Sequence, residues 1–478
     1  MTLRRTKIVA TLGPASDSAA AIEQLILAGM DVARLNFSHG SADDHRTKAQ
    51  LVRELALKHG RSVALMGDLQ GPKIRIARFT NGAVQLQPGH AFTLSTTHPA
   101  EDGTEQIVAV EYPPLIDACQ PGDELLLDDG KIVLQVQAVH DDRVETTVIN
   151  GGELSNNKGV NRRGGGISAP SLTDKDKNDI LLAAALQLDY VAVSFPRYGK
   201  DIQQARDLLQ AAGSSAWLVA KIERAEAVAD DAALDDIISA SDGVMVARGD
   251  LGVEIGDARL VGIQKRIISH ARTLNKLVIT ATQMMESMTT SPVPTRAEVS
   301  DVANAVLDYT DAVMLSGESA TGQYPVQAIQ AMARICLGAE AEPTSGISKH
   351  RLGEVFQRCD DTIALSAMYA ANHFPGIKAI VSLSESGRTP LIMSRIKSTV
   401  PIFCFTRHAA TFQRSALFRG VYGVDFDASA YAADAVAPAA IDFLVQQNRL
   451  QAGDWIILTQ GTQNQPGGTD SMQILQVS

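Results

Sequence analysis

The chain has 478 residues, of which 45% are hydrophobic and 20% charged, and its formal net charge is −11. These values are ordinary for a globular enzyme of about three domains of roughly 150 residues each, whereas the negative charge excludes an extended nucleic-acid surface and allows only a local basic pocket. It contains no run of about 18 uncharged apolar residues that would cross a bilayer and no export signal, and its four cysteines lack metal-ligand spacing. We therefore expect a cytoplasmic enzyme that binds neither membranes nor nucleic acids.

Short runs rich in β-branched residues alternate with helix-like stretches over most of the chain, which is typical of a parallel sheet. Eight such runs are expected strands: 7–12, 31–37, 63–68, 190–194, 217–222, 243–247, 277–281 and 312–315. Because eight βα units close a barrel, we predict a (β/α)8 TIM barrel formed by residues 1–71 and 170–344.

The interval between the third and fourth expected strands is too long for a single crossover connection. Within it, residues 124–127 and 131–137 alternate apolar and polar side chains around Asp129-Gly130, a dipeptide typical of hairpin turns. We therefore predict that residues 72–169 form an all-β domain inserted after the third barrel strand.

The last part of the chain returns to an alternation of strands and helices. Its expected strands are 379–383, 401–405, 421–426 and 455–458, and an expected helix covers 361–372. This pattern predicts a smaller open α/β domain over residues 345–478.

Polar side chains stand at the carboxyl ends of most predicted barrel strands, where barrel enzymes have their active sites. Charged groups buried side by side are costly unless they serve a charged ligand. We interpret this set as a site for an anion and a metal. In chain order its members are Arg34, Asn36, Ser38, Asp68, Lys73, Arg75, Lys221, Glu223, Arg248, Asp250, Thr282, Gln283, Ser316 and Glu318.

Each of these residues also has a purely structural interpretation. Glu223 could form an ordinary ion pair with a neighbouring base, and Asp250 could cap a helix. Thr282 could bond its hydroxyl to the backbone, and Arg34 could pair with a nearby aspartate. We favour a shared site because all of them coincide at one end of one predicted barrel.

The residue types indicate phosphoryl or enolate chemistry. The carboxylates of Glu223 and Asp250 suit Mg²⁺ or Mn²⁺ better than zinc. Lys221 beside them can neutralise a transferring phosphoryl group, and Arg34 and Arg75 can hold phosphate oxygens. The sequence has neither a GxxxxGK[ST] loop nor a kinase-type glycine loop, so a nucleotide would bind by neither common pattern.

Five segments, in the same order and spread over the whole chain, resemble pyruvate kinase: 33–40 (ARLNFSHG), 71–75 (GPKIR), 221–223 (KIE), 245–252 (MVARGDLG) and 281–288 (ATQMMESM). The resemblance implies that the phosphoryl group of phosphoenolpyruvate passes to ADP to form ATP, and that the enolate is then protonated to pyruvate. It also implies a homotetramer, and a mobile lid formed by the β insertion that excludes water from the transfer.

The resemblance implies roles for individual residues by position. Arg34 would bind the substrate phosphate, Lys221 would stabilise the transferring group, and Thr282 would help a water protonate the enolate. The substrate-binding set is Arg34, Lys221, Gly249, Asp250 and Thr282, the nucleotide set is Arg75 and His39, and the Mg²⁺ or Mn²⁺ ligands are Glu223 and Asp250. Asn36, Ser38, Asp68 and the carbonyl of Leu69 would correspond to a monovalent-cation site.

This chain departs from the potassium-dependent members of the family at that last site. At this position those members have a segment that resembles Asp-Thr-Lys-Gly-Pro-Glu, whereas this sequence has Asp68-Leu-Gln-Gly-Pro-Lys73. Because a lysine ammonium is a fixed monovalent charge that can take the place of K⁺, we predict activity without added potassium. A second departure is Tyr198, where the family often has a lysine near the nucleotide; whether Lys200 compensates stays open.

A short motif in the last domain follows an expected strand and precedes a helix. Backbone donors and hydroxyls in such a turn can cradle a phosphate, although an ordinary capped turn has the same residues. Its members are Ser384, Ser386, Gly387, Arg388 and Thr389. The resemblance implies a phosphorylated effector here, and we expect a sugar monophosphate or AMP.

Two other functions remain as alternatives. A metal-dependent, enolate-forming lyase or aldolase would use the same carboxylates but turn over without ADP. An inactive sugar-phosphate sensor would keep the last domain and lose the charged residues of the barrel.

Overall fold

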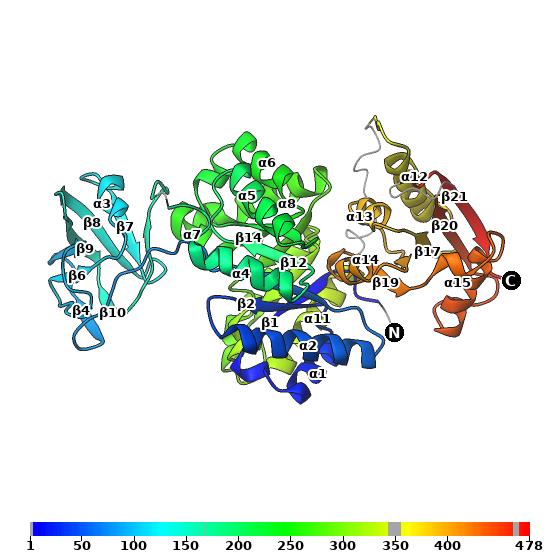
Figure 1. Ribbon diagram of the computed structural model, residues 1–478, viewed down its shortest axis with the longest axis horizontal. Helices are drawn as coiled ribbons and strands as arrows, with labels where there is room; N and C mark the ends of the chain where they lie inside the picture. Colours follow the sequence, from blue (N-terminus) through cyan, green and yellow to red (C-terminus); the bar gives the residue numbers. More distant parts are fainter. Residues whose placement is uncertain (1–2, 168, 343–354, 462–467) are drawn as a thin grey trace.

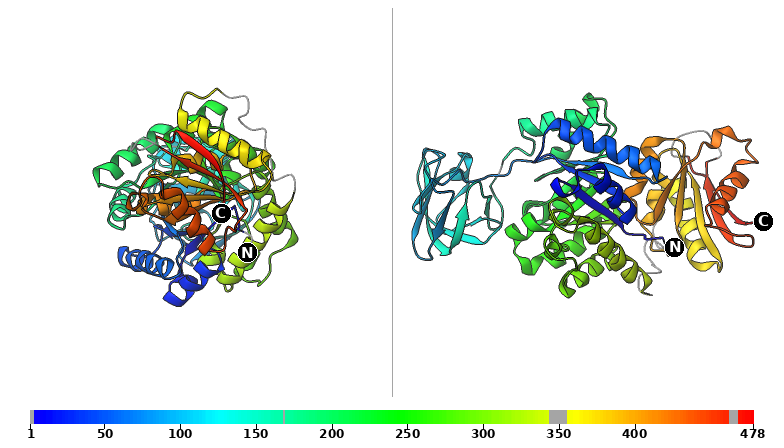
Figure 2. Two further views of the ribbon diagram at one scale, coloured as in Figure 1. Left: turned by 90° about the vertical axis from the view of Figure 1, so that its right-hand side faces the viewer. Right: turned by 90° about the horizontal axis from the view of Figure 1, so that it is seen from below.

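The computed structural model describes residues 3–167, 169–342, 355–461 and 468–478. Its strands form a closed barrel, a β-rich insertion and a C-terminal sheet. The insertion and the C-terminal unit lie at opposite ends of the barrel (Figures 1 and 2). The predicted boundary between residues 344 and 345 lies outside the described residues.

Eight parallel strands close the barrel, which confirms the predicted fold class. The ring closes where β1 pairs with β16, Lys7 opposite Ala312. Strand β2 ends at Asn36, earlier than predicted, because the chain turns there and the His39 N–H donates to the Asn36 carbonyl at 3.2 Å. The strands are β1 (Lys7–Leu12), β2 (Val32–Asn36), β3 (Ala64–Asp68), β12 (Tyr190–Val193), β13 (Trp217–Ile222), β14 (Gly243–Ala247), β15 (Leu277–Ala281) and β16 (Ala312–Leu315).

Helices surround the barrel and begin at strong local signals. Ser41, Thr173 and Thr295 each accept from a backbone N–H one turn ahead in a capping box, which satisfies donors that a helix start leaves unpaired. The helices of the barrel segments are α1 (Ala19–Ala28), α2 (Ala42–Lys58), α4 (Asp174–Ala185), α5 (Gly199–Ala211), α6 (Asp231–Ala240), α7 (Arg248–Ile255), α8 (Asp257–Thr273), α9 (Arg296–Leu307), α10 (Gly317–Ala320) and α11 (Pro325–Ala341).

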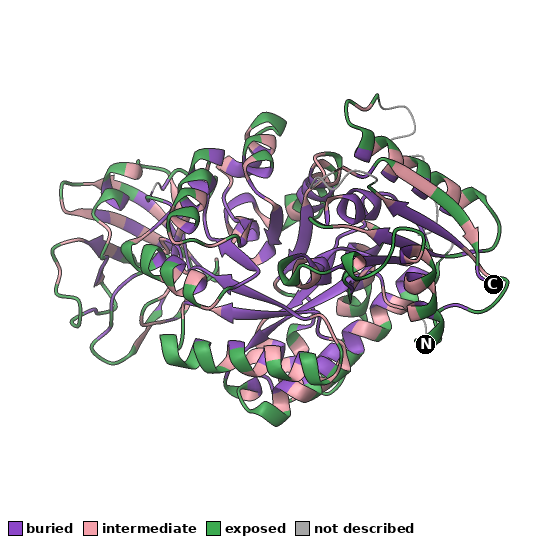
Figure 3. Ribbon diagram, turned by 45° about the vertical axis from the view of Figure 1, so that its right-hand side comes forward, coloured by how far each residue is buried: buried purple, intermediate pink, exposed green. Residues whose placement is uncertain are grey.

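Alternate side chains of each barrel strand enter two different cores. In β1, Ile8 and Ala10 belong to the apolar cluster beneath the helices, whereas Val9 belongs to the cluster that fills the barrel and continues into the C-terminal unit. The strands are therefore buried on both faces, and most of their residues are coloured as buried in Figure 3. A polar side chain at the end of such a strand meets little water.

The insertion between β3 and β12 contains a six-stranded sheet, in the order β11-β7-β8-β9-β5-β6, and the pair β10-β4. The predicted hairpin is present: β7 and β8 pair antiparallel, and Asp128, Asp129 and Gly130 in its turn have φ of 49°, 56° and 85°. The insertion is not all-β as predicted, because α3 (Pro114–Ala118) starts where proline favours a first helical turn. The strands are β4 (Ala83–Leu86), β5 (Ala91–Ser95), β6 (Ile107–Ala109), β7 (Glu124–Leu127), β8 (Ile132–Val139), β9 (Arg143–Asn150), β10 (Gly152–Ser155) and β11 (Val160–Arg162).

The C-terminal unit is a sheet in the order β19-β18-β17-β20-β21 with helices between its strands. The four predicted strands are present, and β21 is a fifth that was not predicted and that pairs antiparallel with β20. No described helix is both long and apolar enough to cross a membrane. The elements are α12 (Cys359–His373), β17 (Ile377–Leu383), α13 (Arg388–Ser394), β18 (Ile402–Thr406), α14 (Ala409–Arg414), β19 (Val421–Asp425), α15 (Val436–Gln446), β20 (Trp455–Gln460) and β21 (Ser471–Gln476).

Candidate active site

Four charged side chains, from β2, β3, β13 and the residue after β13, meet at the carboxyl end of the barrel. Lys221 Nζ lies 2.9 Å from Glu223 Oε1 and 3.3 Å from Asp68 Oδ1. Arg34 Nε donates to Asp68 Oδ2 at 2.7 Å, so the structural partner considered for Arg34 is present. Asp68 and Glu223 are each 1% exposed. The sequence prediction that these side chains converge is therefore realised in the fold.

The positive charges of this cluster are fixed by their neighbours. Burial opposes every charge here, yet Lys221 and Arg34 hold the pKa of Asp68 below its ordinary value, and Asp68 and Glu223 raise the pKa of Lys221. Lys221 also donates to Ser194 Oγ at 2.7 Å, and that hydroxyl donates to the Leu69 carbonyl at 2.8 Å. Lys221 is thus a permanently charged ammonium whose direction is set.

Glu223 differs from the other carboxylate of the cluster. Burial raises its pKa to about 7, with Lys221 opposing the shift and Asp250 adding to it. Its Oε2 accepts the Phe195 N–H at 2.7 Å. Glu223 and Asp250 therefore repel one another, and a divalent cation between them would relieve that repulsion. Two carboxylates with oxygen donors only fit Mg²⁺ or Mn²⁺.

The rest of such a coordination sphere would come from outside the protein. Among residues 3–167, 169–342, 355–461 and 468–478, no group of three or more His, Cys, Asp or Glu could hold a metal ion. Mg²⁺ commonly uses one or two carboxylates and takes its other ligands from substrate and water. A divalent ion held only by Glu223 and Asp250 would therefore need substrate and water for its remaining ligands.

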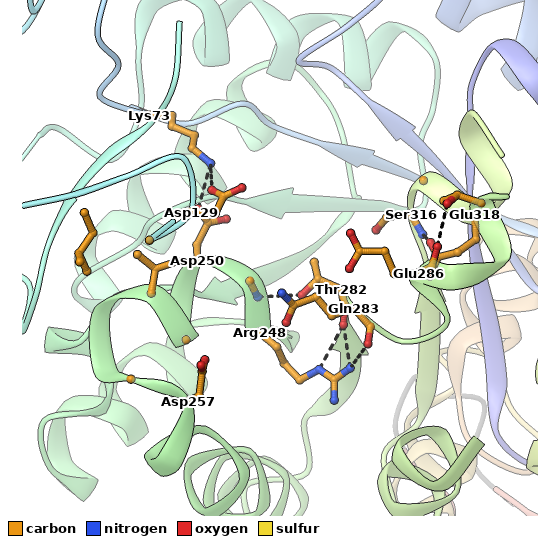
Figure 4. A pocket seen from close by; sticks show the side chains of 18 of the residues that line it. Lys73, Asp129, Arg248, Asp250, Asp257, Thr282, Gln283, Glu286, Ser316 and Glu318 are labelled. Carbon is orange, nitrogen blue, oxygen red and sulfur yellow. Dashed lines mark hydrogen bonds and ion pairs between the residues drawn. The ribbon is translucent and has the colours of Figure 1, made fainter. Parts of the chain in front are cut away.

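Lys73 connects the barrel to the insertion. Its ammonium donates to Asp250 Oδ1 at 3.0 Å and lies 3.7 Å from Asp129 Oδ1 in the β7–β8 turn (Figure 4). Burial opposes the charge, but Asp250 and Asp129 raise the pKa of Lys73. Asp250 lies in the first turn of α7, and Ala247, not Asp250, is the N-cap. The ammonium makes no hydrogen bond to the predicted monovalent-cation site, all four residues of which are described: Asn36, Ser38, Asp68 and Leu69.

Thr282 lies at the end of β15 in a left-handed turn. Thr282 and Gln283 have φ of 66° and 53°, which costs non-glycine residues energy and is common at functional sites. The Thr282 hydroxyl donates to the Ala281 carbonyl at 2.6 Å and accepts the Gly249 N–H at 2.9 Å. The backbone interpretation of Thr282 is correct, and the residue also faces a cavity.

That cavity, of about 490 Å³, lies between the strand ends of the barrel and the insertion (Figure 4). Its wall joins the segments that follow β14, β15 and β16 to the hairpin of the insertion and is rich in charged side chains. The polar residues among those that line it are Lys73, Asp129, Arg163, Arg248, Asp250, Asp257, Thr282, Gln283, Glu286, Thr289, Ser316 and Glu318.

Arg248 holds the left-handed turn, a role that sequence reasoning missed. Its two terminal nitrogens bind the two carboxylate oxygens of Asp301, each at 2.7 Å. Nη2 and Nε also donate to the Thr282 carbonyl at 2.8 and 3.2 Å. Arg248 was recognised as a strand-end residue, but nothing in the sequence linked it to Asp301, which lies 53 positions away.

Some predicted residues lie outside this cavity. Arg75 and His39, predicted to meet the nucleotide, are exposed, and Arg75 donates to the Asn157 carbonyl at 2.8 Å. Lys200 packs its ammonium 5.0 Å from the centre of the Tyr198 ring. These residues are accessible, but the structure does not bring them into contact with the charged cluster.

The predicted effector residues extend from the turn after β17 into the first turn of α13. The Gly387 N–H donates to Ser384 Oγ at 3.0 Å. The guanidinium of Arg388 is turned to α12, where it binds Asp360 at 2.8 Å and Asp361 at 2.9 Å. A phosphate at this turn would have to compete with those two carboxylates for Arg388.

Family models and related proteins match this sequence over most or all of its length. The family model "Pyruvate kinase, barrel domain" matches residues 3–329, and "Pyruvate kinase, alpha/beta domain" matches residues 361–475. Pyruvate kinase II of Salmonella typhimurium is 56% identical over 478 residues, covering 99% of each protein. A pyruvate kinase of Haemophilus influenzae is 53% identical over 96% of each, and one of Geobacillus stearothermophilus is 42% identical over 99% of this chain and 81% of its own length. This chain therefore belongs to the pyruvate kinase family.

Proposed function

We propose that this chain transfers the phosphoryl group of phosphoenolpyruvate to ADP, forming pyruvate and ATP. The observation that carries the proposal is the cluster of Arg34, Asp68, Lys221 and Glu223 at the end of the barrel, whose Glu223 is electrostatically coupled to Asp250. The cluster offers fixed positive charge for a phosphoryl group and carboxylates for a divalent ion in one buried place.

Lys221 and Arg34 would stabilise the charge of the moving phosphoryl group. Lys221 stays protonated at physiological pH, and its ammonium is held by Ser194, Asp68 and Glu223. Arg34 uses Nε for Asp68 and Nη1 for the Thr11 hydroxyl at 2.8 Å, which leaves Nη2 for a phosphate oxygen. Such charges cost little reorganisation because they are already in position.

Glu223 and Asp250 would hold Mg²⁺ or Mn²⁺, which supplies charge neutralisation for the substrate oxygens. Lys73 occupies Asp250 Oδ1, so the ion would either bind Asp250 through Oδ2 or displace the ammonium. Thr282 would hold a water for protonation of the enolate, because its hydroxyl is directed by Ala281 and Gly249. The insertion would be the lid, and Lys73, Asp129 and Arg163 would face the substrate from it.

The test is pyruvate release from phosphoenolpyruvate with Mg²⁺ in potassium-free buffer, with and without ADP. Release that depends on ADP is expected. Turnover without ADP would instead support the lyase or aldolase, and binding without turnover would support the sensor.

The same assay tests the prediction that potassium is not required. Support comes from the charge of Lys73, which Asp250 and Asp129 stabilise. An enzyme that is silent until KCl is added would contradict this prediction.

We also propose a sugar monophosphate or AMP as effector at residues 384–389, a homotetramer, and a cytoplasmic location. These rest on the resemblance to the family and on the free thiols of the four cysteines. Saturation curves for phosphoenolpyruvate that glucose 6-phosphate, ribose 5-phosphate and AMP all leave unchanged would refute the effector. Light scattering on the eluting protein would measure whether the mass is four times 50.9 kDa.

A further inference from the structure

Two connections join the insertion to the barrel, and the returning one has an unusual backbone. Residues 163–167 follow β11, and Gly164, Gly165 and Gly166 have φ of 83°, 81° and 91°. Residues that carry a side chain rarely adopt this backbone conformation. A Cβ on Gly165 would also come within 2.7 Å of the Glu226 carboxylate. The returning linker therefore needs glycine and lies directly against the barrel.

Three contacts attach this linker to the barrel. The Gly164 N–H donates to the Glu254 carbonyl at 2.9 Å, and the Gly166 N–H donates to Glu226 Oε1 at 2.6 Å. The third contact is a hydrogen bond from Arg224 Nη2 to the Ile167 carbonyl. All three partners on the barrel side are polar groups that face the linker.

Arg224 is the centre of this attachment. Its Nε lies 3.6 Å from Glu226 Oε2 and 3.5 Å from Glu254 Oε1, and the arginine is 7% exposed. Glu254 in turn accepts the Ala225 N–H at 2.7 Å through Oε2. One buried guanidinium thus lies between two carboxylates and a carbonyl of the linker.

The position of Arg224 in the chain ties this attachment to the metal site. It directly follows Glu223 at the end of β13, and Glu254 lies on α7, one turn after Asp250. Arg224 and Glu254 therefore extend from the same two elements that supply the proposed metal carboxylates.

We propose that Arg224 is a positioning residue that fixes the returning linker of the lid to the two elements carrying the metal carboxylates. The inference rests on the lid role proposed above. With the linker anchored, the lid moves about a fixed point, so that on closing Lys73, Asp129 and Arg163 return to the same place at the cavity. Without this attachment, the charged side chains of the barrel stay in place, but the lid meets the nucleotide in many orientations.

The test compares Arg224→Met with Arg224→Lys and a matched control, Arg266→Met. Arg266 also donates from Nη2 to a backbone carbonyl, that of Val228, but it makes no contact with the linker. For R224M we expect kcat divided by the KM for ADP to fall about 100-fold, the size of effect that a misplacement of about 1 Å produces. Binding of phosphoenolpyruvate with Mn²⁺, measured by calorimetry without ADP, should be unchanged.

The other variants separate positioning from general stability. R224K should recover part of the loss, because its ammonium can reach the Ile167 carbonyl but cannot span both glutamates, and R266M should stay near wild type. Hydrogen exchange of the Gly164 and Gly166 amides should accelerate in R224M only. If R224M does not fold, Glu226→Ala removes the Gly166 contact from a partly exposed position and should show the same division between ADP kinetics and Mn²⁺ binding.

Two results would overturn the inference. In the first, R224M would lose affinity for phosphoenolpyruvate with Mn²⁺ by as large a factor as it loses kcat/KM for ADP. Arg224 would then be part of the metal site itself. Kinetics and amide exchange like those of R266M would mean that the linker does not depend on Arg224. A wild-type enzyme without ADP-dependent turnover would instead refute the proposed function, and amide exchange would still test the linker.

Discussion

Lys221 is the residue on which the charge balance of the site depends. It lies between two buried carboxylates, those of Asp68 and Glu223, and removing one partner of a buried ion pair leaves the others uncompensated. The same ammonium is the charge that would stabilise the phosphoryl group. Lys221 therefore has both a structural and a proposed catalytic role at this position.

For Lys221→Gln we expect kcat to fall by about 100- to 1000-fold, the range found when one preorganised donor is removed from an active site. The amide can still donate to Glu223, so the fold should persist. Steady-state kinetics together with circular dichroism check this. A variant that keeps more than about a tenth of the wild-type kcat would contradict the role.

The raised pKa of Glu223 predicts that metal binding depends on pH. Its pKa of about 7 in the folded protein lies above the ordinary value of 4.5, so the carboxyl is protonated below about pH 7 and must lose its proton to bind a divalent ion. Metal affinity should therefore increase as the pH rises through 7. The metal-free protein should lose stability as the pH rises from about 4.5 to 7, because the folded state holds this proton more tightly than the unfolded state.

The measurement is the increase in melting temperature caused by Mg²⁺ at several pH values from 5.5 to 8. The increase should be larger at pH 8 than at pH 6. Glu223→Gln, which has no proton to lose, should remove most of this pH dependence. Equal shifts at every pH in the wild type would refute the prediction.

At the scale of an element, the end of β15 shows how a strained turn is kept in place. Thr282 and Gln283 are in the left-handed region, which costs of order 1–3 kcal/mol each. Arg248 compensates by binding the Thr282 carbonyl and both oxygens of Asp301. The start of α7 and the end of β15 are thus one unit.

Arg248→Met should release this turn and lower kcat about 100-fold, because Thr282 would leave its working position. Asp301→Asn keeps an acceptor for Arg248, so its kcat should fall much less. Kinetics and amide exchange at residues 282–284 test both variants. Equal losses in the two variants would mean that charge on Asp301, and not the turn, is what matters.

At the scale of the whole molecule, a buried ion pair joins the barrel to the C-terminal unit. Arg395 follows α13 and Asp311 precedes β16, and each side chain is 1% exposed. Asp311 Oδ2 also accepts the Val278 N–H at 2.9 Å, so the pair reaches the start of β15. Nearby, the rings of Trp217 and Phe418 stack at 5.7 Å across the same junction.

Arg395→Met should destabilise the protein by about 3–5 kcal/mol, because it leaves a buried carboxylate without its partner. Asp311→Asn should cost less, since the amide oxygen can still accept from the backbone. The double variant should cost less than the sum of the two, because no unpaired charge remains. Urea unfolding of the three variants measures this coupling, and strict additivity would show that the two groups do not interact.

The sequence by itself determined the fold class and the chemical character of the site. Strand runs, their number and the long gap after the third one are local properties, since the side-chain pattern follows the period of each element. Strand ends carry the working residues of a barrel, so Arg34, Lys221, Glu223, Asp250 and Thr282 could be selected without coordinates. The strand β21 buries none of its side chains, so it gave no clear periodic signal and was missed.

Only the tertiary structure decided which of these residues touch and which partners hold them. The contacts of Arg248 with Asp301, of Arg224 with the returning linker and of Lys73 with Asp250 join segments far apart in the chain. Such pairings depend on how elements pack, and packing energy is set in three dimensions by shape, burial and charge. Local sequence carries no measure of that energy, which is why the strand ends were predictable and their partners were not.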